Sequence, residues 1–581
     1  MRNTTSSPSY LLHHAIQLVG QYNKLLESYV TSYYADNACH LLPTAWLMQP
    51  GLELNELCYL LSLHQSLDYS MSIKLYRPLP LSLLAYRIAC GSAQLNVDTL
   101  SCTSSKAKGQ GFEVLFCNSA ELEEWLTSNV PVLSARTSGS FSEDSTHCFY
   151  DQRKLPAQFR RHVTPKKEHE ILRHALLVRT VADLLACRTS SEKSALRDCV
   201  IERLIVDVGC GQGHLSRYLS FFHGLKVVNL EADSDHLRKA YKFDRETRAY
   251  LNKKKSRTTS RSPRAHSPIY PRSQPLRITT NTTVDQLARL VSQAQSGEDE
   301  NTRNRTEKPL ENSNRLLLNG LHACGDLSSA IIRLMTESSI ADAMVLVGCC
   351  YMKAVLNPSV NDDGDIGTRK NPFPSQTLWS PQSGTLRNFD IKMSYALLEA
   401  ACHSIPDYIR RLELALTKGV VHLRVHGFRA LVELLLERRY RALTTIKRIG
   451  TDDVVFRFVR CAVKHAHTMD FYEYSSIILN RLASVQQLSE TNQKNELLRP
   501  FSVDEVEDAL RSIGGGMSLD NIWLPVVRYH VFRLMLAPAV EALLLLDRLL
   551  SLQEQGYPCC LVRLFDHRIS PRNIALVALK R

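Results

Sequence analysis

A glycine-rich segment in the first half of the chain has the residue types of a ligand-binding loop. Residues 204–208 read Leu-Ile-Val-Asp-Val, and residues 209–213 read Gly-Cys-Gly-Gln-Gly. Glycine has no side chain and adopts positive φ angles readily, so glycines after a buried strand let backbone amides approach a ligand closely. The segment therefore predicts a ligand site at the carboxyl end of a strand.

The spacing of the glycines separates three classes of nucleotide loop. A P-loop needs Lys and then Ser or Thr after its last glycine, but His214 and Leu215 stand there. A dinucleotide loop needs G-x-G-x-x-G, which would place its third glycine at His214. Asp207 precedes the loop; its carboxylate would repel a pyrophosphate and would suit a ligand with an ammonium group. S-adenosylmethionine carries an ammonium and a sulfonium group and no phosphate.

An acidic residue follows the loop at the distance expected of a nucleoside site. Glu231 ends a second apolar run, 18 residues after Gly213, and a carboxylate there can accept hydrogen bonds from both ribose hydroxyls. We therefore expect S-adenosylmethionine as the cofactor; the alternatives are a glycine turn without a ligand and a nicotinamide site. The residues expected to bind the cofactor are Asp207, Gly209, Cys210, Gly211, Gln212, Gly213 and Glu231.

Apolar patterns around the loop predict a parallel sheet covered by helices on both faces. Thr164 and Pro165 have the form of a helix start and precede an apolar face at helical spacing. Near the C-terminus, apolar runs at 559–565 and 574–580 are joined by a polar stretch rich in turn residues. They predict a terminal antiparallel hairpin.

The motifs together resemble the class I S-adenosylmethionine-dependent methyltransferases. Within this class they are similar to methyltransferase-like protein 25 and its relatives, one branch of which is named for a ribosomal RNA adenine dimethylase domain. The resemblance implies an α/β fold with a Rossmann-like seven-stranded sheet whose last strand is antiparallel, and methyl transfer as the reaction. The segments that carry it are 164–170, 207–219, 320–331, 347–353, 371–376 and 564–580.

In such a fold the methyl acceptor lies over the ends of the first, fourth and fifth strands. The loop at 321–326 offers three candidate catalytic residues, His322, Cys324 and Asp326. Imidazole exchanges protons near neutral pH, so His322 is a candidate general base; Asp326 is a candidate to orient it, and Cys324 to shape the pocket. The alternatives are a structural histidine and an aspartate that favours a helix start. The loop lacks the Pro-Pro pair common in enzymes that methylate adenine amines, which disfavours that acceptor.

The chain divides by pattern into a core and added segments. We expect a mostly helical N-terminal region, the methyltransferase sheet, and two long insertions. The boundaries are a helical region at 1–154, the first two strands at 155–243, a basic and largely disordered insertion at 244–314, the fourth and fifth strands at 315–356, a loop and helical insertion at 357–520, and the last helix and hairpin at 521–581. The third strand is expected within 276–291.

The positive charge of the chain is concentrated in one place. Residues 242–272 hold ten Lys and Arg against Asp244 and Glu246, so +8 of the net +13 lies there. Such a segment can contact RNA, direct nuclear import, or serve only as a linker. We expect RNA or protein as the methyl acceptor; the alternative function is a non-catalytic scaffold with the same fold that binds RNA or protein.

Composition indicates the class of protein and the cell compartment that we expect. The chain is 44% hydrophobic and 22% charged, which is ordinary for a globular protein. Its sixteen cysteines form no C-x-x-C pair, so a reducing compartment and no bound metal are expected. No signal peptide or membrane-length apolar run is present, so we expect a cytoplasmic or nuclear location and no membrane contact.

Overall fold

The computed structural model divides into two compact units. One unit comprises residues 1–100, 355–379 and 391–543, and the other comprises residues 101–354, 380–390 and 544–581. We call them the helical unit and the sheet unit. The structure describes residues 8–47, 51–63, 77–95, 112–128, 155–189, 203–257, 270–296, 315–355, 379–389, 391–443, 463–483 and 496–580.

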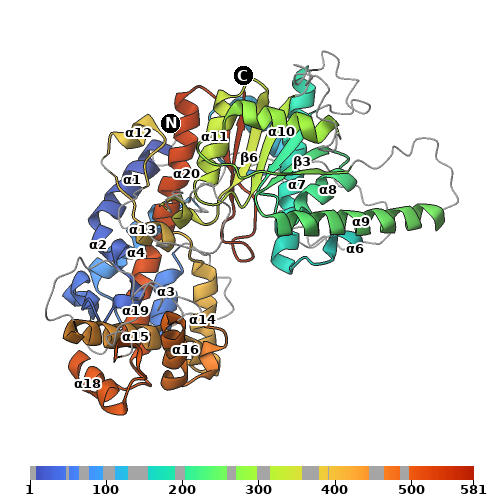
Figure 1. Cartoon of the computed structure of the whole chain (residues 1–581). Helices are drawn as coiled ribbons and strands as arrows, with labels where there is room; N and C mark the ends of the chain where they lie inside the picture. Colours follow the sequence, from blue (N-terminus) through green and yellow to red (C-terminus); the bar gives the residue numbers. More distant parts are fainter. Residues whose placement is uncertain are drawn as a thin grey trace, which may run out of the picture. The chain divides into compact units, whose positions relative to one another are not determined.

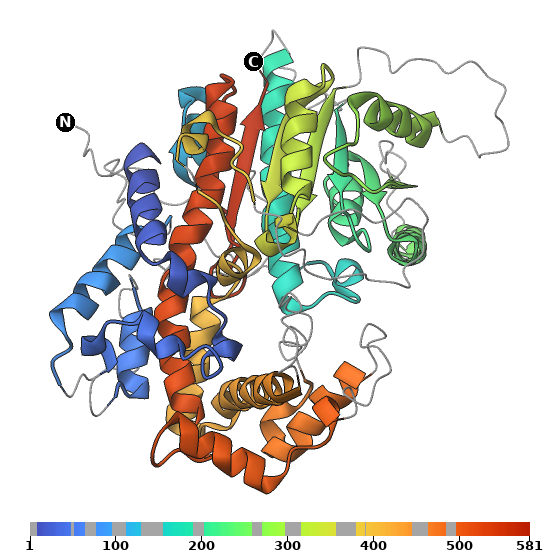
Figure 2. The same cartoon turned by 60° about the vertical axis from the view of Figure 1, so that its left-hand side comes forward.

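The sheet unit is built on one eight-stranded sheet (Figures 1 and 2) of order β1-β7-β8-β6-β5-β2-β3-β4. Its strands are β1 (Glu113–Cys117), β2 (Leu204–Val208), β3 (Lys226–Glu231), β4 (Arg272–Pro275), β5 (Leu316–Leu321), β6 (Ala341–Val347), β7 (Cys559–Arg563) and β8 (Ile574–Leu579). The five strands from β4 to β6 pair in parallel, whereas β8 is antiparallel to β6 and β7. The carboxyl ends of β2, β3, β5 and β6 therefore meet at one edge.

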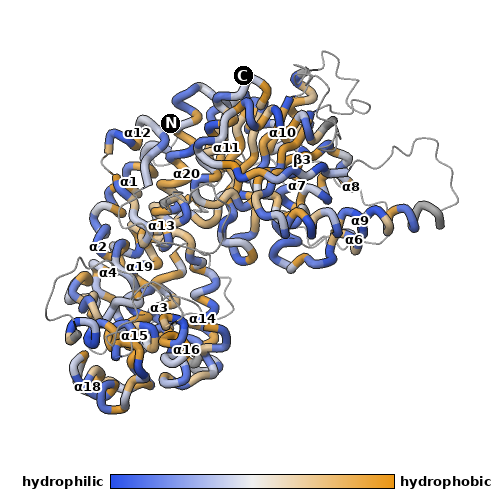
Figure 3. Tube along the Cα trace, viewed as in Figure 1, coloured by the Kyte–Doolittle hydropathy of each residue, from blue (hydrophilic) through white to orange (hydrophobic). Residues whose placement is uncertain are grey.

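Helices cover both faces of this sheet. The helices α5 (Ala120–Ser128), α7 (Pro165–Thr189) and α8 (His214–Phe221) share one apolar core with the strands. The opposite face is covered by α11 (Leu327–Glu337). This helix packs closely on β5: a Cβ added to Gly320 would lie 3.2 Å from Ile331 Cδ1. Both faces of the strands thus require apolar residues, and Figure 3 shows the strands as predominantly hydrophobic. The remaining helices are α6 (Ala157–Arg160), α9 (Ser234–Arg257), α10 (Val284–Ser296) and α12 (Gly384–Arg387).

The predicted α/β class is confirmed, but the sheet has one strand more than expected. The hairpin of β7 and β8 lies where the sequence predicts it. The additional strand, β1, falls in the region expected to be mostly helical and pairs antiparallel with β7. It is a short edge strand of half-buried residues, so it lacks the long apolar run by which the central strands are recognised.

The structure describes only part of the insertion at 244–314, which the sequence predicts to be largely disordered. Helix α9 continues to Arg257, and β4 and α10 both lie within this range. The strand that follows β3 is β4 at Arg272–Pro275, and it precedes the range 276–291 in which the third strand is expected. Its sequence, Arg-Ser-Gln-Pro, has no apolar pattern because β4 is an edge strand held by parallel pairing with β3.

The helical unit joins N-terminal helices to helices from the second half of the chain. The N-terminal Tyr86 hydroxyl donates a hydrogen bond to the Phe532 carbonyl at 2.7 Å. The helices are α1 (Pro8–Gln21), α2 (Asn23–Glu27), α3 (Leu54–Leu61), α4 (Leu81–Ser92), α13 (Tyr395–Ala400), α14 (Ile405–Lys418), α15 (Val421–Leu443), α16 (Phe471–Ala483), α18 (Val503–Ile513) and α19 (Trp523–Met535), and the unit boundary falls within α20 (Ala537–Glu554). No helix within the described residues has the length and apolarity needed to cross a membrane.

A buried arginine links three segments of the helical unit. Arg533 of α19 donates hydrogen bonds to the carbonyls of Leu26 (3.2 Å) and Ala396 (2.5 Å). Its guanidinium lies 3.4 Å from the Glu399 carboxylate. Burial raises the pKa of Glu399, but hydrogen bonds and charge from His403 and Arg533 outweigh it and hold the pKa at about 2. The N-terminal segment is therefore tied to the later helices by a hydrogen bond from an arginine that also pairs with Glu399.

Replacing this arginine should destabilise the helical unit strongly. We expect Arg533→Ala to lower the free energy of unfolding by about 3 to 5 kcal/mol, because it removes a buried charge partner of Glu399 and the hydrogen bonds to two carbonyls. The control is Arg410→Ala, which breaks an exposed pair with Asp407 and should cost less than about 1 kcal/mol. Urea unfolding followed by circular dichroism makes the comparison, and equal losses would contradict the role given to Arg533.

Candidate functional site

The glycine loop presents open backbone at the carboxyl end of β2. Gly209, Gly211 and Gly213 have φ angles of 71°, 58° and 66°, a region that other residues rarely adopt. A Cβ at Gly211 would meet no described atom within 4 Å, whereas one at Gly213 would lie 3.3 Å from Ala240 of α9. The middle glycine thus faces open space, and the last one allows α8 and α9 to pack closely.

Glu231, at the end of the adjacent parallel strand β3, lies beside this open glycine. Its carboxylate accepts hydrogen bonds from the Gly211 amide at 2.7 Å and from the Asp233 amide at 3.0 Å. The loop and the acid at the end of β3 therefore form one surface. A ribose on that surface would meet a carboxylate able to accept from its hydroxyls.

Cys210 and Gln212 complete the loop. Burial raises the pKa of the Cys210 thiol, so this cysteine stays protonated and unreactive. The Gln212 side-chain oxygen lies 3.4 Å from His214 Nε2, and its carbonyl accepts a hydrogen bond from Arg217 at 3.1 Å. Arg217 of α8 thus holds the loop through the Gln212 carbonyl.

Asp207 is expected to contact the ligand, but the structure places it beneath the loop. The residue is 2% exposed. Its carboxylate accepts hydrogen bonds from the Asn319 amide of β5 at 2.8 Å and from the Ser216 hydroxyl of α8. Burial raises the pKa of the Asp207 carboxyl to about 6, against the lowering effect of these hydrogen bonds. Both oxygens are engaged by the protein, so Asp207 supports the loop from inside.

The hydrogen bonds of Asp207 continue to helix α7. Asn319 Oδ1 lies 2.6 Å from Nε2 of His174, which is fully buried. Burial lowers the pKa of His174 to about 4, so the ring is neutral at physiological pH and donates from Nε2. The sequence reasoning missed Ser216, Asn319 and His174, although Asn319 is the one polar residue of its strand, Leu-Leu-Leu-Asn-Gly-Leu.

Asp207→Asn should stabilise the ligand-free protein above pH 6. The folded-state pKa of about 6 exceeds the ordinary 3.8, so the wild type loses stability as the pH rises from about 4 to about 6. The Asn variant keeps the shape without the charge and should be more stable by about 1 to 3 kcal/mol above pH 6. Its advantage should vanish near pH 4 in urea unfolding. A difference that is the same at every pH, or that also occurs in the exposed control Asp235→Asn, would contradict this account.

His322 begins the loop after β5 and is held by a residue of α7. It has a φ of 69°, and its Nε2 lies 3.1 Å from the buried carboxylate of Glu170. The other oxygen of Glu170 accepts from the Ser570 hydroxyl at 2.7 Å. Burial raises the pKa of Glu170, but hydrogen bonds from His322 and Ser570 outweigh it and leave the pKa below its ordinary value. Glu170 is therefore a carboxylate that orients the ring, a role that the sequence gives to Asp326.

Asp326 and Cys324 lie in the same loop with different partners. Asp326 immediately precedes α11, and its side chain makes no capping hydrogen bond within the described residues. Burial raises the pKa of Asp326, and the charge of Arg548 opposes this effect. Cys324 Sγ lies 2.6 Å from Cys349 Sγ, at the end of the adjacent strand β6. The loop thus brings an imidazole, a carboxyl and thiols to the edge where an acceptor is expected.

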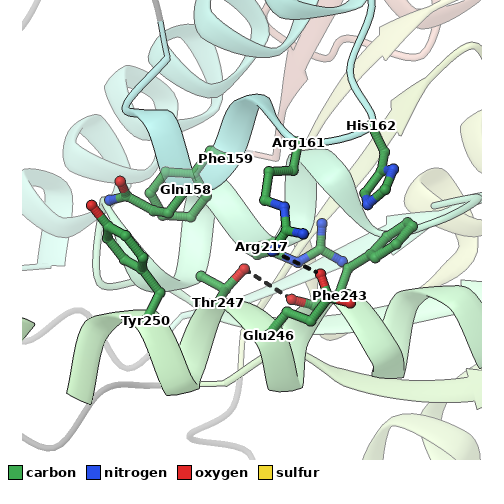
Figure 4. Close-up of a pocket in the computed structure, with 9 residues that line it drawn as sticks. All are labelled: Gln158, Phe159, Arg161, His162, Arg217, Phe243, Glu246, Thr247 and Tyr250. Atoms are coloured by element: carbon green, nitrogen blue, oxygen red, sulfur yellow. Dashed lines mark hydrogen bonds and ion pairs between the residues drawn. The ribbon is translucent and has the colours of Figure 1, made fainter. Parts of the chain in front are cut away.

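A separate pocket lies between α6, α8 and α9 (Figure 4). His162, with a φ of 63°, stacks on Phe243 at a centroid distance of 4.5 Å. The pocket is lined by Gln158, Phe159, Arg161, His162, Arg217, Phe243, Glu246, Thr247 and Tyr250. Its described lining includes no residue of the glycine loop, and Arg217, which donates to the Gln212 carbonyl, links the pocket to that loop.

Comparison with known proteins addresses the same part of the chain. A family model described as a methyltransferase domain matches residues 166–355, which run from the start of α7 through β6 and include both candidate loops. The chain contains a methyltransferase domain. This finding confirms the resemblance inferred from the motifs, although the matched range leaves out the terminal hairpin.

Two curated relatives carry the name "Probable methyltransferase-like protein 25". The mouse protein is 23% identical over 274 residues, which are 47% of this chain and 38% of the relative. The human protein is 24% identical over 269 residues, which are 46% of this chain and 37% of the relative. The alignments thus span less than two fifths of each relative, and no solved structure matches the chain.

Proposed function

We propose that this protein transfers the methyl group of S-adenosylmethionine to an acceptor held over the ends of β2, β5 and β6. The observation that supports this most directly is the hydrogen bond from the Gly211 amide to the Glu231 carboxylate, beside the open face of that glycine. The two groups lie at adjacent strand ends within the matched methyltransferase domain. The Glu231 carboxylate keeps lone pairs that can accept from ribose hydroxyls, beside a glycine that leaves room for a ligand.

Different residues of the site bind different parts of S-adenosylmethionine. The loop backbone from Gly209 to Gly213 lies against the amino-acid end, and Glu231 accepts from the ribose. S-adenosylmethionine, when bound, supplies a methyl group on a sulfonium. Asp207 acts through charge: its ionised form is costly in the empty site, as the raised pKa shows, and a cation above the loop offsets that cost.

The loops after β5 and β6 receive the acceptor. Glu170 accepts a hydrogen bond from His322 Nε2, which leaves Nδ1 as the ring atom that takes a proton from the acceptor. Asp326 and Cys324 then form the wall of the acceptor pocket. Methyl transfer between two bound groups depends on their alignment, and the pairing of β2 with β5 sets the distance between donor and acceptor loops.

The acceptor is proposed to be RNA or protein, in the cytoplasm or the nucleus. The basic stretch 242–272 supports RNA, and its described part includes the second half of α9. Tyr250 is exposed there, whereas Tyr270 packs against Phe221 and Arg248. Backbone phosphates are therefore better matched by α9 than stacked bases are.

Gly211→Ala tests the donor site against a matched control. Gly211 and Gly224 both have positive φ angles, and a Cβ added to either would have no described atom within 4 Å. Alanine at either position should therefore cost about 1 to 2 kcal/mol of stability. In calorimetry, only Gly211→Ala should weaken the affinity for S-adenosylmethionine, by about tenfold or more. Equal affinities of the two variants, or no binding by the wild type, would refute the proposed site.

Glu170→Gln tests the role of His322. We expect the rate of methyl transfer to fall by about tenfold to a hundredfold, because the ring loses the carboxylate that fixes its orientation. The affinity for S-adenosylmethionine should be unchanged, since Glu170 does not contact the glycine loop in the described structure. The assay follows radiolabelled methyl groups into a cell extract, with Glu124→Gln on the surface of α5 as control.

The outcome of this assay also decides the acceptor class. Label that RNase removes and protease leaves would identify RNA, and the reverse would identify protein. Wild-type activity in Glu170→Gln would exclude His322 and Glu170 from a catalytic pair. Tight binding of S-adenosylmethionine without incorporation in any extract would favour a non-catalytic scaffold.

A further inference from the structure

Three cysteines from two strand ends form one cluster. The Sγ atoms of Cys324, Cys349 and Cys350 all lie within 4.8 Å of one another. The separations are 2.6 Å between Cys324 and Cys349 and 3.6 Å between Cys349 and Cys350. All three side chains are half-buried, so the cluster is shielded from bulk water yet open to a small ion.

Backbone hydrogen bonds hold the two strand ends in this arrangement. The amides of Ala323 and Gly325 donate to the carbonyls of Val347 and Cys350 at 2.9 and 3.2 Å. Gly325 has a φ of 58°, and a Cβ on it would lie 2.7 Å from the carbonyl carbon of Lys353. Only glycine fits this close approach, so the fold itself brings the sulfurs together.

We propose that Cys324, Cys349 and Cys350 bind one zinc ion as thiolates, with a fourth position open to water or to a ligand. Tetrahedral zinc with Zn–S bonds of about 2.3 Å places sulfurs about 3.8 Å apart, which small side-chain rotations reach here. Thiolates select zinc and other soft metals over magnesium or calcium. Three protein ligands and one open position are typical of zinc sites that act on a bound molecule.

The surrounding charges favour such a site. Three thiolates around Zn²⁺ carry a net charge of −1, and cations approach from two sides. A Cβ at Gly348 would lie 2.8 Å from a guanidinium nitrogen of the buried Arg548, so this side chain packs against the residue before Cys349. The charge of Lys353 acts on Cys350 from the other side.

The sequence predicts no bound metal because its cysteines lack the short spacings of common zinc sites. Cys324 and Cys349 are 25 residues apart, and only the pairing of β5 with β6 brings them together. The zinc site does not rest on the proposed methyl transfer, because neither the glycine loop nor Glu231 contributes a ligand. Its position beside His322 makes the open coordination site a place for an acceptor atom.

Metal analysis of the whole chain tests the proposal. Protein purified under reducing conditions without chelator should hold about one zinc per chain. Cys324→Ser, Cys349→Ser and Cys350→Ser should each lower this content by about tenfold or more, whereas the half-buried Cys187→Ser in α7 should leave it unchanged. In the wild type, Co²⁺ in place of zinc should show the charge-transfer absorption of thiolate ligands, and each of the three variants should weaken it.

A second measurement needs no variant. Zinc should protect the three cysteines of the cluster from alkylation in the folded wild type, relative to Cys187, and a chelator should remove the protection. A wild type that takes up no zinc, variants that keep it, or a Cys324–Cys349 disulfide in the reduced protein would overturn the proposal. Calorimetry with S-adenosylmethionine on the zinc-free chain separates this outcome from failure of the donor site.

Discussion

The candidate site depends on the hydrogen bonds that the buried carboxylate of Asp207 accepts. A buried charge is tolerated only with hydrogen-bond partners, and those of Asp207 come from α8 and β5. Through Asn319 the same interaction reaches His174 on α7. The strand before the glycine loop, the helix after it, the adjacent strand and a covering helix are thereby fixed to one carboxylate. The loop can remain open at Gly211 because its support lies beneath it.

The elements that the sequence predicts well are those whose burial leaves a pattern. β2, β5 and β6 are buried along their whole length and mostly apolar because helices cover both faces of the sheet. The contact of Gly211 with Glu231 follows from the parallel pairing of β2 with β3, since the ends of adjacent parallel strands meet. The edge strands β1 and β4 were not predictable, because their pairing is carried by backbone hydrogen bonds that place little demand on residue type.

The parts of the site that sequence reasoning missed are partners distant along the chain. Glu170 lies 152 residues before His322, and Cys349 lies 25 residues after Cys324. A single acid on a helix, or a cysteine at a strand end, has no period or spacing that distinguishes it from an ordinary core residue. Strand order supplies the missing information: β5 lies between β2 and β6, so the loop after β5 touches both neighbours.

The same strand order separates two chemical environments along one edge of the sheet. The ends of β2 and β3 carry Asp207 and Glu231, which suit a cationic nucleoside. The ends of β5 and β6 carry thiols that face Arg548 and Lys353, which suit an anion or a thiolate-bound metal. Under the proposed function, a cationic donor is attracted to the first half and kept out of the second. Transfer then takes place at the boundary, where Glu170 holds the ring of His322.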